Sequence, residues 1–248
     1  MGRIICAGLG PGDPELISVK SDRAIRSAKQ LAFFRKAGRK GQARQIVEGM
    51  LSDEVVEYPM EYPVTTELPF DSPEYRKILS DFYDEWTERL AQLSQSEDVV
   101  VLCEGDPFLY GSFMHLQERL KAYPEVEVDI IAGIPGMVGC WNALGTPFTW
   151  GDDVLTVLMG TMDEEEMVAR MRASDAIVVM KTGRNLPRVR RALERTGRLS
   201  DAWVVERGSM PTERIAKLEE MDATDCPYFA IVLVHGNGRK PGLDGAET

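Results

Sequence analysis

IICAGLGPGD, residues 4–13, is the stretch of sequence that decides the fold: an apolar run passes directly into a loop with three glycines. The arrangement returns twice, where apolar runs lead into Glu104-Gly105-Asp106-Pro107 and Gly133-Ile134-Pro135-Gly136. Ligands of open parallel sheets bind outside the carboxyl ends of strands, and glycines there let a backbone approach a ligand closely. Three such loops therefore predict a binding site. In the alternative interpretation each loop is only a tight turn, with Asp13 or Asp106 capping a helix.

The apolar runs alternate with amphipathic stretches, which is the pattern of βαβ units and a parallel sheet. In the first half we expect strands at 3–7, 30–34, 54–58, 98–103 and 126–132 and helices near 15–28, 42–51, 73–95, 109–121 and 136–144, with a proline-rich loop at 58–71. In the second half we expect strands at 154–159, 176–180, 202–206 and 228–234 and helices near 163–173 and 185–196. Turn residues cluster at 145–153. We therefore predict an α/β chain of two domains, 1–145 and 146–248.

Composition narrows the class of protein. The 248 residues carry a formal net charge of -11 and a pI near 4.8, and 44% of them are apolar. That is typical of a folded protein, and the field of an acidic chain disfavours nucleic acid or an anionic membrane as a partner. No apolar stretch has the roughly 18 residues of a membrane span and no signal peptide is evident, so we expect a cytoplasmic protein. The four cysteines lack metal-ligand spacing and predict no metal site.

The first loop also permits a test of dinucleotide binding. The nucleotide fingerprint is Gly-x-Gly-x-x-Gly, but Asp13 takes the place of its third glycine, and a carboxylate there would repel a pyrophosphate. Arg35 follows the second predicted strand and could hold a 2′-phosphate, so an NADP-dependent oxidoreductase stays an alternative. An acidic loop suits a cationic ligand better, and the sulfonium of S-adenosylmethionine is such a cation.

Two of the loops extend into longer motifs, GLGPGDPEL at 8–16 and EGDPFLYGS at 104–112. Together they closely resemble the tetrapyrrole (precorrin) methylases, the two-domain S-adenosylmethionine methyltransferases of the cobalamin pathway. Further segments resemble the branch of that family that methylates C-20 of precorrin-2: YPVTTE at 62–67, DFYD at 81–84, VVMK at 178–181, GRNL at 183–186, VER at 205–207 and PYF at 227–229. The resemblance runs from residue 8 to about 234, which is nearly the whole chain.

The resemblance implies a mostly parallel N-terminal sheet, a mixed C-terminal sheet, and S-adenosylmethionine folded in the cleft between the two domains. It places these residues against the cofactor: Pro11, Glu104, Gly105, Asp106, Leu109, Pro135, Gly136, Met180, Gly208, Phe229 and Ala230. Pro135 and Gly136 stand where relatives usually carry small hydroxyl, thiol or alanine side chains, so a hydroxyl that relatives offer the cofactor is missing. For Met180 the alternative is a core methionine at the end of a buried strand.

The implied reaction is attack of C-20, a meso carbon of the tetrapyrrole, on the sulfonium methyl, with loss of the C-20 proton and S-adenosylhomocysteine as product. Because the leaving group is already activated in the cofactor, the protein mainly holds two reactants in line, and no catalytic triad is needed. The candidate bases for the departing proton are Glu61, Tyr62, Asp106, Tyr110 and His115, and none is preferred. The resemblance also implies a homodimer.

Precorrin-2 carries eight carboxylates, so an acidic protein needs local basic residues to bind it. Segment 35–44 holds five basic residues and no acid, segment 181–198 holds seven with one acid, and the remainder carries a charge of -22. Arginine suits the paired recognition of carboxylates, although solvated helix faces are the alternative for Arg188, Arg191 and Arg195. The substrate-binding residues that we predict are Arg35, Tyr62, Thr65, Tyr110 and Arg184.

Besides the oxidoreductase, two other functions are alternatives to methylation of precorrin-2. One is the same chemistry on the cobalt-loaded substrate, cobalt-factor II, which sequence separates poorly from the metal-free reaction. The other is a non-catalytic tetrapyrrole carrier, in which the glycine loops are only turns.

Overall fold

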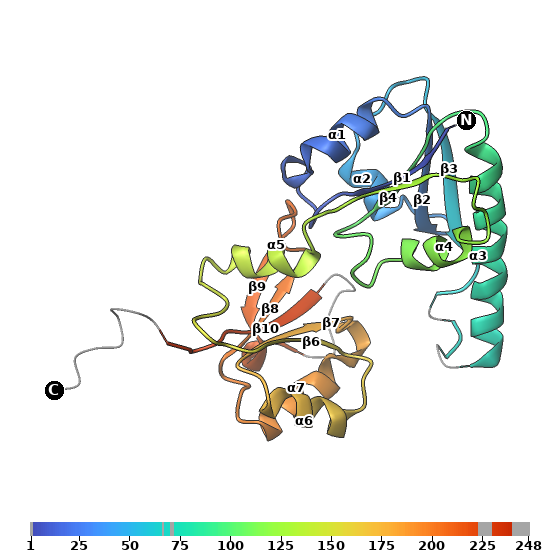
Figure 1. Ribbon diagram of the computed structural model, residues 1–248. Helices are drawn as coiled ribbons and strands as arrows, with labels where there is room; N and C mark the ends of the chain where they lie inside the picture. The colour runs from blue at the N-terminus through green and yellow to red at the C-terminus, as the bar shows by residue number, and fades with distance from the viewer. Residues whose placement is uncertain (1, 66, 70–71, 223–229, 240–248) are drawn as a thin grey trace. The chain divides into compact units, whose positions relative to one another are not determined.

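The computed structural model describes residues 2–65, 67–69, 72–222 and 230–239. The chain divides into two compact units, Met1–Gly136 and Met137–Thr248. Each unit is built around its own five-stranded sheet (Figure 1).

The sheet of the first unit is wholly parallel. Its strands are β1 (Ile4–Gly8), β2 (Gln30–Lys36), β3 (Val56–Tyr62), β4 (Val99–Cys103) and β5 (Val128–Ile131), in the order β3-β2-β4-β1-β5. Gly8 at the end of β1 stands opposite Cys103 at the end of β4, and Ala7 stands opposite Ile131 at the end of β5. The three glycine loops therefore leave neighbouring strands at one edge of the sheet, as the sequence predicted.

Helices cover both faces of this sheet (Figure 1). They are η1 (Pro14–Leu16), α1 (Val19–Arg26), α2 (Gln42–Ile46), α3 (Pro73–Leu93) and α4 (Phe113–Leu120). The helices α1 and α2 pack on one face, where Ile25 and Ala43 join a buried cluster with Leu31. The helices α3 and α4 pack on the other face, where Leu90 and Leu116 are fully buried. Apolar residues on both faces of the strands explain the continuous apolar runs of the sequence.

The third strand differs from the prediction. We expected a strand at 54–58 followed by a loop, but β3 runs from Val56 to Tyr62 and contains Pro59. Because β3 is an edge strand, the missing N–H of Pro59 costs no bond on its open side. Glu61 and Tyr62 consequently belong to the end of a strand, where they stand opposite Arg35 and Lys36 of β2.

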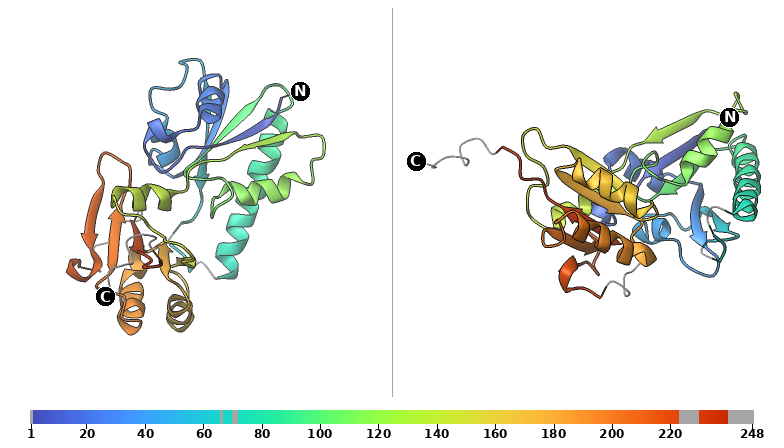
Figure 2. Two further views of the ribbon diagram at one scale, coloured as in Figure 1. Left: turned by 60° about the vertical axis from the view of Figure 1, so that its left-hand side comes forward. Right: turned by 90° about the horizontal axis from the view of Figure 1, so that it is seen from below.

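The second unit carries a mixed sheet, as expected. Its elements are α5 (Gly136–Ala143), β6 (Leu155–Met159), α6 (Glu164–Arg172), β7 (Ala176–Met180), η2 (Gly183–Asn185), α7 (Leu186–Arg195), β8 (Ala202–Glu206), β9 (Arg214–Lys217), η3 (Leu218–Glu220) and β10 (Ala230–Val234). The strand order is β6-β7-β10-β8-β9, with β6 and β7 parallel and the other pairs antiparallel. The helices α6 and α7 lie side by side (Figure 2) and share one buried cluster with the sheet.

The two units divide between Gly136 and Met137, at the first residue of α5, whereas the domain boundary that we expected lies between 145 and 146. The packing of Cys140 gives the reason. Its side chain is buried and joins Val178, Val205 and Leu233 in a cluster on the sheet of the second unit. The helix therefore belongs to the unit whose core it completes.

The core of the first unit supplies a stability prediction. Leu90→Ala removes a fully buried side chain between α3 and the sheet and should lower the free energy of unfolding by about 2–5 kcal/mol. Gln92→Ala, at an exposed position of the same helix, should change it by less than about 0.5 kcal/mol. Urea denaturation followed by circular dichroism measures both. Equal losses in the two variants would contradict the packing described here.

Candidate functional site

The first two glycine loops are joined to each other through their backbones. The N–H of Leu9 donates to the carbonyl of Cys103 at 2.9 Å. One residue further, the N–H of Gly105 donates to the Gly10 carbonyl at 2.8 Å, and the N–H of Gly10 donates back to Gly105 at 3.3 Å. The pair forms an isolated antiparallel bridge beyond the ends of β1 and β4. The loops that follow these strands are therefore held in one arrangement.

The third loop packs against the other two so closely that only glycine fits. A Cβ atom at Gly8 would lie 2.5 Å from the backbone nitrogen of Gly133, and a Cβ atom at Gly133 would overlap the carbonyl oxygen of Gly105. Gly105 also has a φ of 64°, in the left-handed region that favours glycine. These three glycines serve backbone packing between the loops.

Asp106 fastens the second loop to the third. One carboxylate oxygen, Oδ1, accepts a hydrogen bond from the N–H of Phe108 at 2.9 Å. The other, Oδ2, accepts from the N–H of Gly133 at 3.0 Å. Both oxygens thus bind backbone donors within the first unit, which gives Asp106 a structural role in shaping the site.

Two other acidic side chains of the loops act as caps. Asp13 accepts from the N–H of Glu15 at 2.9 Å and caps η1, so the turn interpretation holds for that residue. Glu104 accepts from the N–H of Ala43 at 2.9 Å, at the start of α2, where Gly41 offers no side-chain cap. Each carboxylate satisfies a helical N–H that would otherwise lack a partner.

Large apolar side chains stand exposed around the three loops. They are Leu16, Phe108, Tyr110, Met114 and Ile134, from the loops themselves and from the start of α4. Exposed apolar groups gathered at one edge of a sheet are typical of a binding surface. Tyr110 has a φ of 57°, a conformation that non-glycine residues rarely adopt and that occurs preferentially at functional sites. Leu109 and Pro11 lie in the same loops.

In the second unit, the predicted cofactor residues lie at or beyond strand ends. Met180 ends β7 and is partly buried against the cluster around Cys140. Gly208 follows β8, and a Cβ atom there would lie 2.8 Å from the sulfur of Cys140 and 2.9 Å from its Cα. Ala230 is buried at the start of β10, and its carbonyl accepts from the hydroxyl of Thr182 at 2.7 Å. Phe229 lies outside the described residues.

Beside Gly208, the structure adds Glu206, which the sequence analysis did not select. Its side chain is buried, and its Oε1 has no hydrogen-bond partner; the Nη1 atom of Arg214 lies 3.8 Å away and Nη2 of Arg207 lies 3.5 Å from Oε2. A buried carboxylate oxygen without a hydrogen-bond donor is costly, so Glu206 is a candidate for contact with a ligand. The pattern VER alone carried no signal of this burial.

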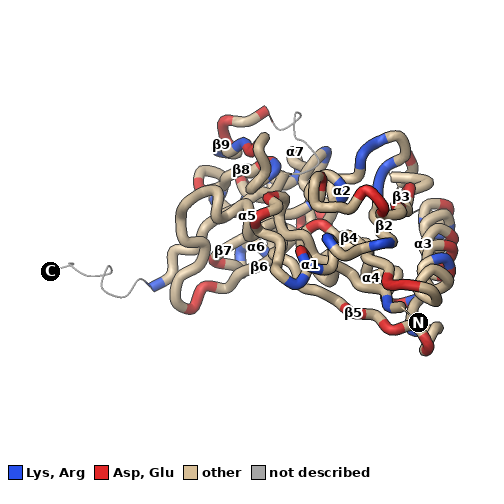
Figure 3. The backbone as a smooth tube through the Cα atoms, turned by 90° about the horizontal axis from the view of Figure 1, so that it is seen from above, with Lys and Arg blue, Asp and Glu red and all other residues tan. Residues whose placement is uncertain are grey.

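Most of the basic residues in segment 35–44 are paired. Figure 3 marks them in blue between β2 and α2. The pairs are Arg35 with Glu61, Lys36 with Glu67, Lys40 with Glu48, and Arg44 with Glu57. Among the described residues Arg39 has no ion pair. Arg35, which also supported NADP binding, is therefore held by a carboxylate.

The arginines of α7 are paired as well. Arg188 donates to the carbonyl of Met162 at 2.9 Å, while Arg191 and Arg195 bind Glu164 at 2.9 and 3.1 Å. Arg195 also binds Glu165, and these contacts lower the pKa of both glutamates. These contacts favour the alternative interpretation, in which the three arginines belong to the surface of the helix.

Two cations just before α7 differ from these arginines. Lys181 and Arg184 are exposed, and neither side chain makes an ion pair or hydrogen bond with a described residue. Lys181 has a φ of 54°, and the backbone between the two residues contains Gly183 with a φ of 30°. Unpaired cations on a strained turn after a strand are suited to anionic groups of a ligand.

The remaining predicted substrate residues lie at the end of β3. The hydroxyl of Tyr62 donates to Ser112, so it is engaged within the first unit. Thr65 bonds to Glu67 through both its backbone N–H and its hydroxyl, the former at 2.6 Å. Arg35 binds Glu61 at 2.6 Å across the two strands. Tyr110, by contrast, stays 48% exposed.

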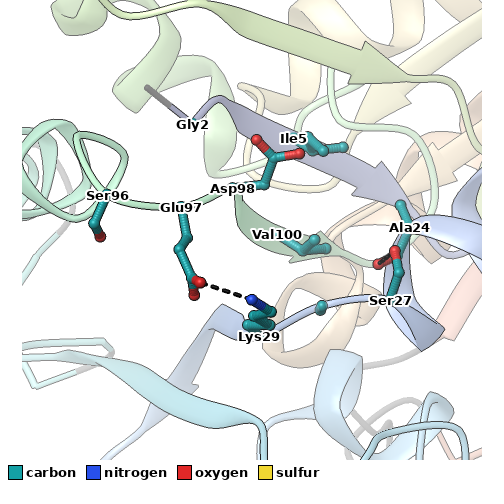
Figure 4. Close-up of a pocket in the computed structure, with 10 residues that line it drawn as sticks. Gly2, Ile5, Ala24, Ser27, Lys29, Ser96, Glu97, Asp98 and Val100 are labelled. Atoms are coloured by element: carbon teal, nitrogen blue, oxygen red, sulfur yellow. Dashed lines mark hydrogen bonds and ion pairs between the residues drawn. The ribbon is translucent and has the colours of Figure 1, made fainter.

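A cavity of about 380 Å³ lies at the opposite ends of the strands, before β1 and β4 (Figure 4). Lys29 and Glu97, which line it, form an ion pair at 2.8 Å. Across the residues the structure describes, no helix is both long and apolar enough to cross a bilayer. The same residues contain no cluster of three His, Cys, Asp or Glu side chains that could hold a metal.

Comparisons with known proteins agree with this geometry. A family model described as "Tetrapyrrole (Corrin/Porphyrin) Methylases" matches residues 3–222. The chain is 48% identical to a precorrin-2 C(20)-methyltransferase of Sinorhizobium sp over 97% of this chain and 98% of that one. It is 25% identical to a cobalt-precorrin-2 C(20)-methyltransferase of Salmonella typhimurium over 94% and 96%. A uroporphyrin-III C-methyl transferase from Thermus thermophilus, solved with S-adenyl homocysteine, has a TM-score of 0.66 at 21% identity over 94% and 97%.

The loop packing predicts different costs at two neighbouring glycines. Gly133→Ala should lower the free energy of unfolding by roughly 1–3 kcal/mol, because its Cβ overlaps the backbone of Gly105. Gly136→Ala, where a Cβ would meet nothing within 4 Å, should change it by less than about 0.5 kcal/mol. Thermal unfolding of both variants checks this. A Gly133→Ala protein as stable as the parent would refute the close packing.

Proposed function

Because the chain belongs to the tetrapyrrole (corrin/porphyrin) methylase family, we propose that it transfers a methyl group from S-adenosylmethionine to C-20 of precorrin-2 in cobalamin biosynthesis. The observation that carries this proposal is the 48% identity to a precorrin-2 C(20)-methyltransferase over nearly all of both chains. Identity to the enzyme named for the cobalt-loaded substrate is 25%. The metal-free tetrapyrrole is therefore the preferred substrate, and neither the oxidoreductase nor the carrier is favoured.

Enzymes of this family use S-adenosylmethionine, and the residues of this chain suit that cofactor. In the first unit, the cofactor residues that we propose are Pro11, Glu104, Gly105, Asp106, Leu109, Pro135 and Gly136. In the second unit they are Met180, Gly208, Phe229 and Ala230. Glu206 supports the fit, because its buried Oε1 lacks a donor that an amino group of the cofactor would supply.

The bound cofactor supplies a methyl group that is already activated on a sulfonium. The chain must hold the two reactants in position. The locked loops after β1, β4 and β5 offer a fixed surface that needs no reorganisation when ligands bind. Of the candidate bases, Glu61 is paired with Arg35 and both oxygens of Asp106 bind backbone N–H groups. Tyr62 is hydrogen-bonded, and burial raises its pKa. These three groups hold the site. Tyr110 and His115 are both exposed, and the ring of His115 packs on Tyr83 with centroids 4.7 Å apart.

The carboxylates of the tetrapyrrole need cations that are not already neutralised. Lys181 and Arg184 meet that condition in the second unit, and Arg39 meets it in the first. Tyr110 offers an exposed ring for the macrocycle. In this proposal Arg35 and Thr65 act through their carboxylate partners Glu61 and Glu67, which shape the end of β3. We further propose that the protein acts in the cytoplasm as a homodimer, and the family resemblance supports the dimer.

A direct assay tests the reaction. Purified protein incubated with precorrin-2 and S-adenosylmethionine labelled in its methyl group should yield a tetrapyrrole carrying one label at C-20, located by NMR. Parallel incubation with cobalt-factor II should give slower transfer. A clear preference for the cobalt complex would replace the substrate proposed here, and absence of transfer to either would remove the activity.

Two arginine variants distinguish a direct contact with the substrate from an effect of surface charge. Arg184→Ala should raise the KM for precorrin-2 by about tenfold, since it removes a charge-assisted contact. Arg191→Ala deletes an equal charge that is already paired with Glu164 and should leave the KM unchanged. Steady-state kinetics at saturating S-adenosylmethionine measure both. Equal effects in the two variants would mean that only net charge matters.

A further inference from the structure

Tyr110 sits in a loop whose two ends are both fastened. On the amino side, Asp106 accepts from the N–H of Phe108 at 2.9 Å. On the carboxyl side, Gly111 packs on Pro107, where a Cβ atom would lie 2.8 Å from the carbonyl oxygen. The left-handed φ of 57° at Tyr110 persists because both sides of the residue are constrained.

Ser112 also constrains this loop, through a hydrogen bond that is unusual for its position in the helix. It is the N-cap residue of α4, a position where a serine hydroxyl ordinarily accepts from the N–H groups of the first turn. Here Ser112 makes no capping bond, and its hydroxyl instead accepts from the hydroxyl of Tyr62. The serine thus ties the start of α4 and the preceding loop to the end of β3.

Tyr62 is well suited to be the fixed partner in this bond. Its ring stacks on Phe34, with centroids 5.5 Å apart, and lies 5.2 Å from the ring of Phe82. The ring of Tyr83 packs against Phe82 with centroids 5.3 Å apart. Burial raises the pKa of both tyrosines, so both phenols stay protonated and can donate at physiological pH.

We infer that Tyr62 is a positioning residue: through Ser112 it holds Tyr110 in the orientation that receives the tetrapyrrole, without contacting the substrate through its own hydroxyl. This inference rests on the proposed function and deepens it. It differs from the sequence-based prediction, in which Tyr62 itself binds substrate. The hydroxyl that would make that contact is already engaged with Ser112.

The test uses Tyr62→Phe, which keeps the stacked ring and removes only the hydroxyl. The KM for precorrin-2 should rise about tenfold while kcat and the Kd for S-adenosylhomocysteine stay unchanged. Ser112→Ala should have the same effect, and the double variant should equal either single one, because both delete the same bond. Tyr58→Phe is the matched control: its hydroxyl, on the same strand, donates to Gln30 at 3.3 Å, and the kinetics should not change.

Amide hydrogen exchange of the ligand-free protein supplies a readout that does not need activity. Tyr62→Phe and Ser112→Ala should each speed exchange in residues 108–114, and Tyr58→Phe should not. Parent-like exchange and kinetics in both variants would overturn the inference. So would additive effects, or a loss of cofactor binding equal to the loss of substrate binding. An inactive parent protein would instead refute the proposed function, and the exchange data would still decide the role of Tyr62.

Discussion

The backbones of three loops come so close together that a Cβ atom at Gly8 would overlap Gly133, and one at Gly133 would overlap the carbonyl oxygen of Gly105. This contact is possible because β4, β1 and β5 are neighbours in a parallel sheet, so their carboxyl ends meet at one edge. The carboxylate of Asp106 then fixes the second loop against the third. The remaining exposed groups of the loops, including Tyr110, take their positions from this junction.

The distribution of charge determines which cations can bind a substrate. An acidic chain can bind a polycarboxylate only if some of its cations have no carboxylate partner. Most of the basic residues in segments 35–44 and 181–198 do have such a partner. Arg35 and Arg195, for example, are bound by glutamates. Among the described residues, neither Lys181 nor Arg184, in the turn after β7, has a carboxylate partner. Local pairing, rather than net charge, decides which arginines remain available.

The sequence predicted those features that depend on neighbours along the chain. The parallel sheet and the three loops followed from apolar runs that end in glycine, the mixed sheet followed from the family resemblance, and all are present. The end of β3 was misread because Pro59 looks like a loop residue until β3 is known to be an edge strand. The short strand β9 gave no apolar signal. The hydrogen bond between Tyr62 and Ser112 joins residues fifty positions apart, so a local sequence pattern cannot predict it.

We propose that the locked glycine loops form the cofactor-binding surface. A crystal structure with S-adenosylhomocysteine tests this most directly. We expect electron density for the ligand against Pro11, Gly105 and Gly136, with the two bonds of Asp106 unchanged. Density at the other end of the strands, in the cavity lined by Lys29 and Glu97, would contradict it.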